Sequence, residues 1–159
     1  LETELFFKGI RPAISIGLSV SRVGATAQIK WIKFVAGDLK LQLTQFRELE
    51  AFVSFGGELD KTSKFLINRG TKLTELLKQP IHQPYDVDLI IISLYAGLKG
   101  YFDNIPVTLI KQVEQNLIFE FSFYRRALIP LFQCNFRRKR TRKKLLHFLN
   151  YLLYIFFTY

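Results

Sequence analysis

The chain has 159 residues, of which 49% are hydrophobic and 23% are charged. This length predicts one domain, or one domain with part of a second, and the composition is typical of globular rather than disordered chains. A single cysteine, Cys134, excludes an internal disulfide and a cysteine-rich zinc site. With only two histidines, His82 and His147, we expect no metal centre. Because methionine is absent, we expect either a processed chain or a piece of a longer one.

The formal net charge of +10 is concentrated at one end of the chain. Residues 1–124 contain fourteen basic and thirteen acidic residues, whereas residues 125–159 contain nine basic and no acidic residues. The basic character therefore belongs to the C-terminal tail. The nearly neutral remainder does not have the charge of a nucleic-acid-binding surface, and we expect no nucleic acid among its partners.

Residues 1–24 are expected to be extended and turn structure. Pro12 fixes the start of a strand, and apolar and small polar residues then alternate over residues 13–20, as in a half-buried strand that Gly24 closes. No second strand is predicted nearby. Because a lone strand cannot satisfy its backbone groups, we expect it to pair with a sheet supplied by other sequence or by another chain.

From Ala25 onward the pattern is helical. Apolar residues recur at helical spacing, and Gly37, Gly56, Gly70 and Gly100 are predicted to interrupt or end helices. Asp60 and either Asp86 or Asp88 are predicted N-caps. The expected helical segments are residues 25–36, 39–53, 60–69, a short turn at 71–77, 86–98 and 107–128, with a proline-containing loop at 79–85. This order favours an all-α bundle.

Arg22 is the residue with the clearest chemical meaning. It follows the predicted strand and precedes the first helix, so it would project from the carboxyl edge of a sheet, where ligands bind in open α/β folds. Guanidinium groups match phosphate oxygens in geometry and charge. From position alone, Arg22 is either a phosphate contact or a surface arginine paired with a carboxylate.

Residues 2–14 and 17–24 carry a more specific signal. Pro12, Ala13, Ile14, Ser19 and Ser21 fit a pattern of Pro, small, aliphatic, polar, three residues, Ser, any residue, Ser, with serine at position 15 where asparagine is usual. This sequence resembles the alpha subunit of the F-type ATP synthase. The resemblance continues to about residue 125, through segments 27–30, 35–37, 39–41, 45–48, 55–56, 59–60, 68–70, 73–79 and 95–101.

The resemblance implies a mainly α fold in three parts. Residues 1–24 would be the end of an α/β nucleotide-binding domain, a short strand and turn. Residues 25–128 would be the C-terminal helical-bundle domain, and residues 129–159 a divergent basic and apolar tail. The sequence contains no Gly-x-x-x-x-Gly-Lys-Thr phosphate loop. The chain alone is therefore expected to be no enzyme and to bind no nucleotide, and ATP or ADP with Mg²⁺ is expected only in an assembled complex.

The resemblance also implies site residues. The arginine that matches Arg22 acts in trans as an arginine finger on a catalytic site of the neighbouring beta subunit. Residues that match Phe6, Arg11, Pro12 and Gln79 contact the adenine of a non-catalytic nucleotide. Ile81 stands where a second glutamine is usual, so adenine recognition would depend on stacking and Gln79, and Phe6 and Pro12 could instead be ordinary packing residues.

The same resemblance implies beta and gamma subunits as partners in a hetero-oligomer that couples proton transport to ATP synthesis. Loop residues 56–60 would lie near the gamma subunit, or form a simple helix connection. The expected location is the matrix side of the mitochondrial inner membrane, because the composition is that of A/T-rich coding, with a bacterial or plastid energy-coupling membrane as the alternative.

The tail departs from the family. Residues 137–144 include seven basic residues in eight, and residues 145–159 are almost wholly apolar but too short to span a bilayer. The basic stretch could be a solvated or lipid-facing helix stripe, a membrane-surface anchor, an RNA contact, or sequence without function. The rival function is a non-enzymatic membrane- or RNA-associated helical protein derived from an alpha-subunit fragment, and a third is a degenerate fragment that does not fold.

Overall fold

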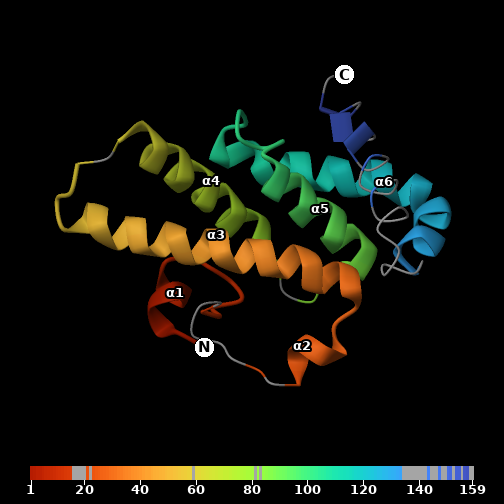
Figure 1. The fold of residues 1–159 in the computed structure, drawn as a ribbon, viewed down its shortest axis with the longest axis horizontal. Coiled ribbons are helices and arrows are strands. Elements are labelled where there is room, and N and C mark those ends of the chain that lie inside the picture. Colours follow the sequence, from red (N-terminus) through yellow and green to blue (C-terminus); the bar gives the residue numbers. More distant parts are fainter. Residues whose placement is uncertain are drawn as a thin grey trace.

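In the part of the chain that a computed structural model describes, all the secondary-structure elements are helices (Figure 1). The described residues are 1–15, 21, 23–58, 60–80, 82, 84–133, 143, 147, 150, 151, 153, 154, 156 and 157. The elements, in chain order, are α1 (Thr3–Phe7), α2 (Gly24–Ala27), α3 (Lys30–Ser54), α4 (Lys61–Leu77), α5 (Val87–Lys99), the 3₁₀ helix η1 (Val107–Leu109) and α6 (Ile110–Gln133). The prediction of a mainly α helical bundle is confirmed.

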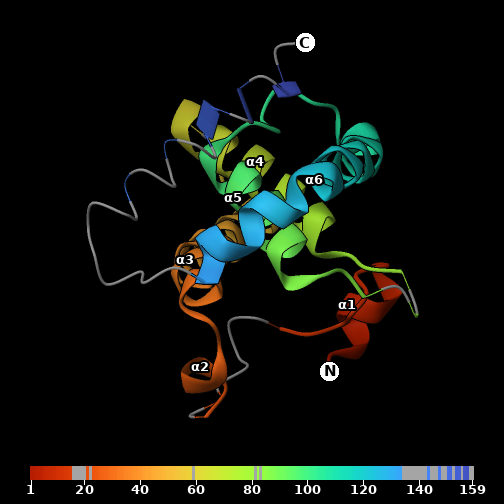
Figure 2. The same cartoon turned by 90° about the vertical axis from the view of Figure 1, so that its right-hand side faces the viewer.

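Helices α3, α4, α5 and α6 pack around one hydrophobic core, and α1 and α2 lie outside it (Figures 1 and 2). Helix α3 contributes Trp31, Val35, Leu39 and Leu43, all 5% exposed or less. These residues recur every four positions, so they form one buried stripe along the helix. Helix α5 is buried on most of its surface, as its apolar sequence predicts. The N-terminal segment is joined to this bundle by hydrogen bonds to α3 and to the loop after α4.

Two predicted helix breaks are wrong. Gly37 lies inside α3 and Gly70 lies inside α4, and residues 71–77, predicted as a separate turn, complete α4. Gly37 faces open space, so it only weakens the local helical preference. Gly70 is buried against Phe46, where a Cβ atom would meet the phenylalanine side chain at 2.3 Å. The absence of a side chain there allows α3 and α4 to approach closely.

Other helix ends agree with the sequence. The Asp60 carboxylate accepts a hydrogen bond from the Ser63 backbone N–H at 2.9 Å and caps α4. Gly56, just after α3, and Gly100, just after α5, both have φ of +84°. This left-handed conformation is accessible to glycine at little cost and stops a helix. Asp86 is the N-cap residue of α5.

The N-terminal segment differs from the expectation of extended structure. Residues 3–7 form the short helix α1, and no strand is present at 13–15, the described part of the predicted strand at 13–20. Backbone bonds of other kinds are made here: the Ile14 N–H donates to the Pro12 carbonyl and closes a tight turn, and the Glu2 N–H donates to the Ala13 carbonyl and joins the two ends of the segment, both at 2.9 Å. Residues 16–20 lie outside the described residues.

The described residues near the C-terminus return to the bundle. Leu153 is fully buried in the core, and Phe156 and Phe157 pack against it. Cys134 and residues 137–142 lie outside the described part. Over the residues that the structure describes, no helix is both long and apolar enough to cross a bilayer.

Candidate functional site

The N-terminal segment folds back on itself beside α3 and α4. Within it, the Ile10 N–H donates to the Leu5 carbonyl at 2.9 Å, and Gly9 adopts a φ of +74°, which reverses the chain after α1. The following Arg11–Pro12 peptide bond is cis. This hairpin-like path brings both ends of the segment together, and the segment is joined to the bundle by hydrogen bonds from Gln79 to Arg11 and from Arg47 to Ser15.

Three of the residues predicted to contact adenine lie close together. The Arg11 guanidinium carbon lies 4.5 Å from the centroid of the Phe6 ring, which is a cation–π contact. The Gln79 backbone N–H donates to the Arg11 carbonyl at 2.9 Å. Gln79 follows the end of α4, so this bond ties the N-terminal segment to the loop after that helix. Phe6 is 49% exposed, which leaves part of its ring open to solvent rather than committed to the core.

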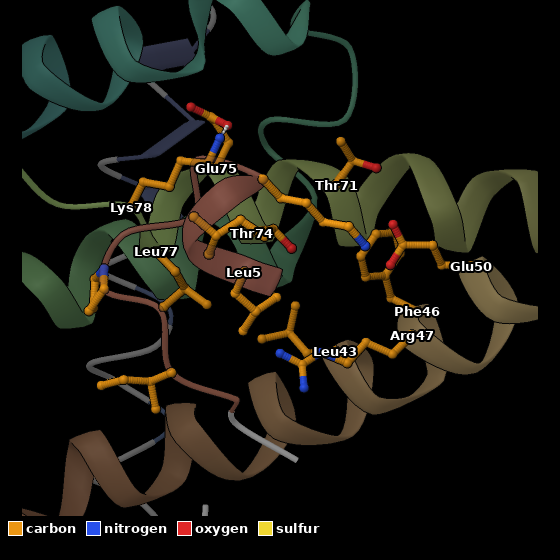
Figure 3. Close-up of a pocket in the computed structure, with 14 residues that line it drawn as sticks. Leu5, Leu43, Phe46, Arg47, Glu50, Thr71, Thr74, Glu75, Leu77 and Lys78 are labelled. Carbon is orange, nitrogen blue, oxygen red and sulfur yellow. Dashed lines mark ion pairs between the residues drawn. The ribbon is translucent and has the colours of Figure 1, made fainter. Parts of the chain in front are cut away.

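Beside this cluster lies a cavity of about 450 Å³ (Figure 3). It is bounded by α1, the turn that follows it, α3 and α4, and Pro12 is part of its wall. In Figure 3, Leu5 of α1 faces Leu43 of α3 across the opening. The apolar walls are formed by Leu5, Ile10, Pro12, Ile14, Leu43, Phe46 and Leu77. The polar lining consists of Lys8, Arg47, Glu50, Thr71, Thr74, Glu75 and Lys78.

Several of the charged groups around the cavity are already paired. Lys78 and Glu75 form an ion pair at 2.6 Å, one helical turn apart. Lys8 pairs with Glu4 at 2.9 Å, and this hydrogen bond and charge lower the pKa of the Glu4 carboxyl. Arg47 instead donates to the Ser15 hydroxyl at 2.6 Å. Since Ser15 is only 7% exposed, this bond fixes the start of the segment that leads toward Arg22.

Arg22 and Ile81 lie outside the described residues, so the predicted roles of both remain predictions. The neighbours of Arg22 are described. The Ser21 hydroxyl accepts a hydrogen bond at 2.8 Å from the backbone N–H of Gly24, the first residue of α2. The predicted turn from this segment into a helix is therefore present on the C-terminal side of Arg22.

Two polar clusters were not predicted. Arg69 of α4 pairs with Asp103, and Lys72 donates to the Asp103 carbonyl. In the second cluster, the buried Glu114 carboxylate accepts from Ser93 at 2.8 Å and from Lys111 at 2.7 Å. The i,i+3 spacing of Lys111 and Glu114 was the one local signal available. The remaining contacts join residues that are distant in sequence.

The described residues contain no group of three or more His, Cys, Asp or Glu side chains arranged to hold a metal ion. The polar groups near Phe6, Arg11 and Gln79 are instead hydrogen-bond donors and acceptors beside an exposed aromatic ring. Such a set can hold a planar ligand by stacking and hydrogen bonding.

A family model for the ATP synthase alpha/beta chain, C terminal domain, matches residues 28–148. The chain is 53% identical over 129 residues to the ATP synthase subunit alpha of Neorickettsia sennetsu, covering 81% of this chain and 25% of that protein. It is 55% identical over 120 residues to the ATP synthase subunit alpha of Rickettsia bellii, and this match covers 76% of this chain and 23% of that protein. The chain is 58% identical over 117 residues to the ATP synthase subunit alpha of Aquifex aeolicus, and this match covers 74% of this chain and 23% of that protein. The chain thus spans about a quarter of the length of these relatives.

Proposed function

The chain belongs to the ATP synthase alpha/beta chain family, as a C-terminal portion of the alpha type, and we propose that it works in a proton-driven ATP synthase. In this role it is a non-catalytic subunit that supplies Arg22 to a catalytic site on a neighbouring beta subunit. The observation that carries the proposal is the identity of 53–58% to alpha subunits over most of this chain.

The chemistry of this role follows from the guanidinium group. Negative charge develops on the transferring phosphoryl group, and a cation held in place before the reaction stabilises it without further reorganisation. The described neighbours support such positioning. The Ser21 hydroxyl, one residue before Arg22, accepts a hydrogen bond from the backbone N–H of Gly24, the first residue of α2. The Arg47–Ser15 hydrogen bond anchors the same segment on its other side.

The second part of the proposal is a non-catalytic nucleotide, bound with Mg²⁺ in the assembled complex. Phe6 and Pro12 would pack on the adenine, while Arg11 and Gln79 would donate hydrogen bonds to it. The cation–π contact of Arg11 with Phe6 and the backbone bond to Gln79 already hold three of these residues together. Beta and gamma subunits are the proposed partners. The proposed location is an energy-coupling membrane, on the matrix side in mitochondria or the cytoplasmic side in bacteria.

The experiment replaces Arg22 by alanine and by lysine in the assembled complex and measures steady-state ATP turnover. We expect Arg22→Ala to lower kcat by roughly 10³–10⁵ and lysine to restore only part of it, since an ammonium lacks the planar fork. Lys30→Ala, an exposed basic position at the start of α3, serves as the control and should leave turnover unchanged. Full cooperative turnover by Arg22→Ala would refute the arginine-finger role.

A further inference from the structure

Lys111, near the start of α6, bonds the end of α4. Its ammonium donates to the Leu76 carbonyl at 3.4 Å and to the Lys78 carbonyl. Carbonyls at a helix end lack partners within the helix, so a donor from another element satisfies them, and a cation there matches the negative end of the helix dipole. An ammonium has three N–H donors, and the third acceptor is the Glu114 carboxylate at 2.7 Å.

Glu114 holds Lys111 from inside the bundle. Glu114 is 2% exposed, and its carboxylate also accepts a hydrogen bond from the Ser93 hydroxyl of α5 at 2.8 Å. A buried carboxylate is costly to leave without its cation, so the two groups keep each other in place. One polar network therefore connects α6, α5 and the end of α4.

The network acts on a single peptide group that leads to the N-terminal segment. The carbonyl of Lys78 and the N–H of Gln79 belong to the same peptide group. The carbonyl accepts from Lys111, and the N–H donates to the Arg11 carbonyl at 2.9 Å. Because a peptide group is planar, fixing the direction of its oxygen also fixes the direction of its N–H. The Arg11 guanidinium in turn lies over the Phe6 ring.

The network also lies close to the other end of the loop that carries Gln79. Burial, and the negative charge of Glu114, raise the pKa of the Tyr85 hydroxyl above its ordinary value. Tyr85 is the last residue before the N-cap of α5. The Glu114 and Lys111 side chains therefore influence the loop where it leaves α4 and where it reaches α5.

We infer that Lys111, held by Glu114, is a positioning residue for adenine recognition. It sets the direction of the Lys78–Gln79 peptide group and thereby keeps Gln79 beside Arg11. Lys111 acts through this peptide group and needs no contact with the nucleotide. The inference rests on the proposed nucleotide binding at these residues and is independent of the proposed role of Arg22.

The first test measures backbone hydrogen exchange in the full chain by NMR, at Gln79 relative to the buried Ile92 of α5. The double variant Lys111→Met, Glu114→Gln removes the ammonium without leaving an unpaired buried carboxylate. We expect exchange at Gln79 to become about fivefold faster relative to Ile92, the loss expected for one hydrogen bond. Lys111→Arg keeps a cation with N–H donors and should change this ratio little.

Lys72→Met is the matched control. Lys72 is 5% exposed and also donates to a backbone carbonyl, that of Asp103 in the turn after α5. Its loss should accelerate exchange at Gln79 and Ile92 by the same factor, because it acts only through overall stability. Equal acceleration at the two amides in the Lys111→Met, Glu114→Gln variant would identify a purely structural role for the pair and would overturn the inference.

The second test measures nucleotide recognition in the assembled complex. A photoreactive azidoadenine analogue of ADP is added with Mg²⁺, and mass spectrometry quantifies label on peptides that contain residues 6–12 or 79 of this chain. We expect the Lys111→Met, Glu114→Gln variant to need about fivefold more analogue for half-maximal labelling, and Lys72→Met to match the wild type. Absence of label from the wild type would refute the proposed nucleotide binding. Half-maximal labelling of the wild type and the double variant at the same concentration would instead refute the role of Lys111.

Discussion

Substituting Gly70 and Gly37 by alanine should have opposite effects on stability. Both glycines lie inside long helices, α4 and α3 respectively, so alanine has the same local advantage at both. Their surroundings differ. A Cβ atom at Gly37 meets nothing within 4 Å, whereas at Gly70 it falls 2.3, 2.4 and 2.5 Å from Cγ, Cδ2 and Cβ of Phe46. The pair therefore separates helix propensity from interhelical packing.

The expected magnitudes follow from these distances. Alanine in place of glycine stabilises a helix interior by about 1 kcal/mol, which is the whole effect expected for Gly37→Ala. At Gly70 the same gain is opposed by overpacking, which costs about 1–3 kcal/mol. The contact with Phe46 Cβ favours the upper part of that range, because this atom is fixed to the α3 backbone and cannot rotate away. We expect a net loss of about 1–2 kcal/mol for Gly70→Ala.

Urea unfolding of the chain, followed by far-ultraviolet circular dichroism, measures both variants against the wild type. A third comparison places Gly70→Ala in a Phe46→Ala background, because Phe46→Ala removes the ring that the new methyl group meets. In that background, Gly70→Ala should destabilise the chain less than it does in the wild type, because the contacts with the ring are gone and only the contact with Cβ of residue 46 remains. Equal unfolding midpoints for Gly70→Ala and Gly37→Ala would refute the reasoning that α3 and α4 pack through a glycine.

Two further predictions concern polar groups. Asp103→Asn should cost about 2 kcal/mol in urea unfolding, because it leaves the partly buried Arg69 guanidinium without its carboxylate, whereas Asp38→Asn on the exposed side of α3 should be neutral. Burial raises the pKa of Tyr95 and of Tyr101 above the ordinary value of 10.0. The stability that these neutral hydroxyls contribute is present below pH 10 and is lost as the pH rises through their raised pKa values. The urea concentration at the unfolding midpoint should therefore fall as the pH is raised through that range. It should fall less steeply in a Tyr95→Phe, Tyr101→Phe double variant, which lacks both hydroxyls.

Helix ends could be predicted where the determining chemistry is local. Asp60 caps α4 through a residue three positions away, and Gly56 and Gly100 end helices through their own left-handed backbone. Gly37 and Gly70 have the same local signal as these stops but lie within helices. What distinguishes them is the surrounding packing, which a single sequence does not contain.

Helix α1 was missed for the same physical reason. It has five residues and no side-chain cap, so its own sequence gives little reason for a helix. It is fixed by the bond between Glu2 and Ala13 and by the later Gln79–Arg11 bond. Both bonds join backbone groups. The residues at these positions therefore leave no side-chain pattern from which the contact could be inferred.

The four residues predicted to contact adenine, which are Phe6, Arg11, Pro12 and Gln79, were identified from the resemblance to alpha subunits. The structure adds how three of them lie relative to one another. Phe6 and Arg11 share a cation–π contact, and Gln79 is joined to Arg11 through the backbone. The prediction for Gln79 concerns its side-chain amide. The bond observed uses the main chain and does not engage that amide.

The tail shows where periodicity stops being informative. Residues 145–159 are almost all apolar, so no helix face stands out against a polar background. Asn150, Leu153 and Phe157 are spaced i, i+3 and i+7, but the sequence contains several other sets of residues with helical spacing. The face that docks is selected by Tyr95 and Tyr101, which offer hydroxyl donors where Asn150 can accept.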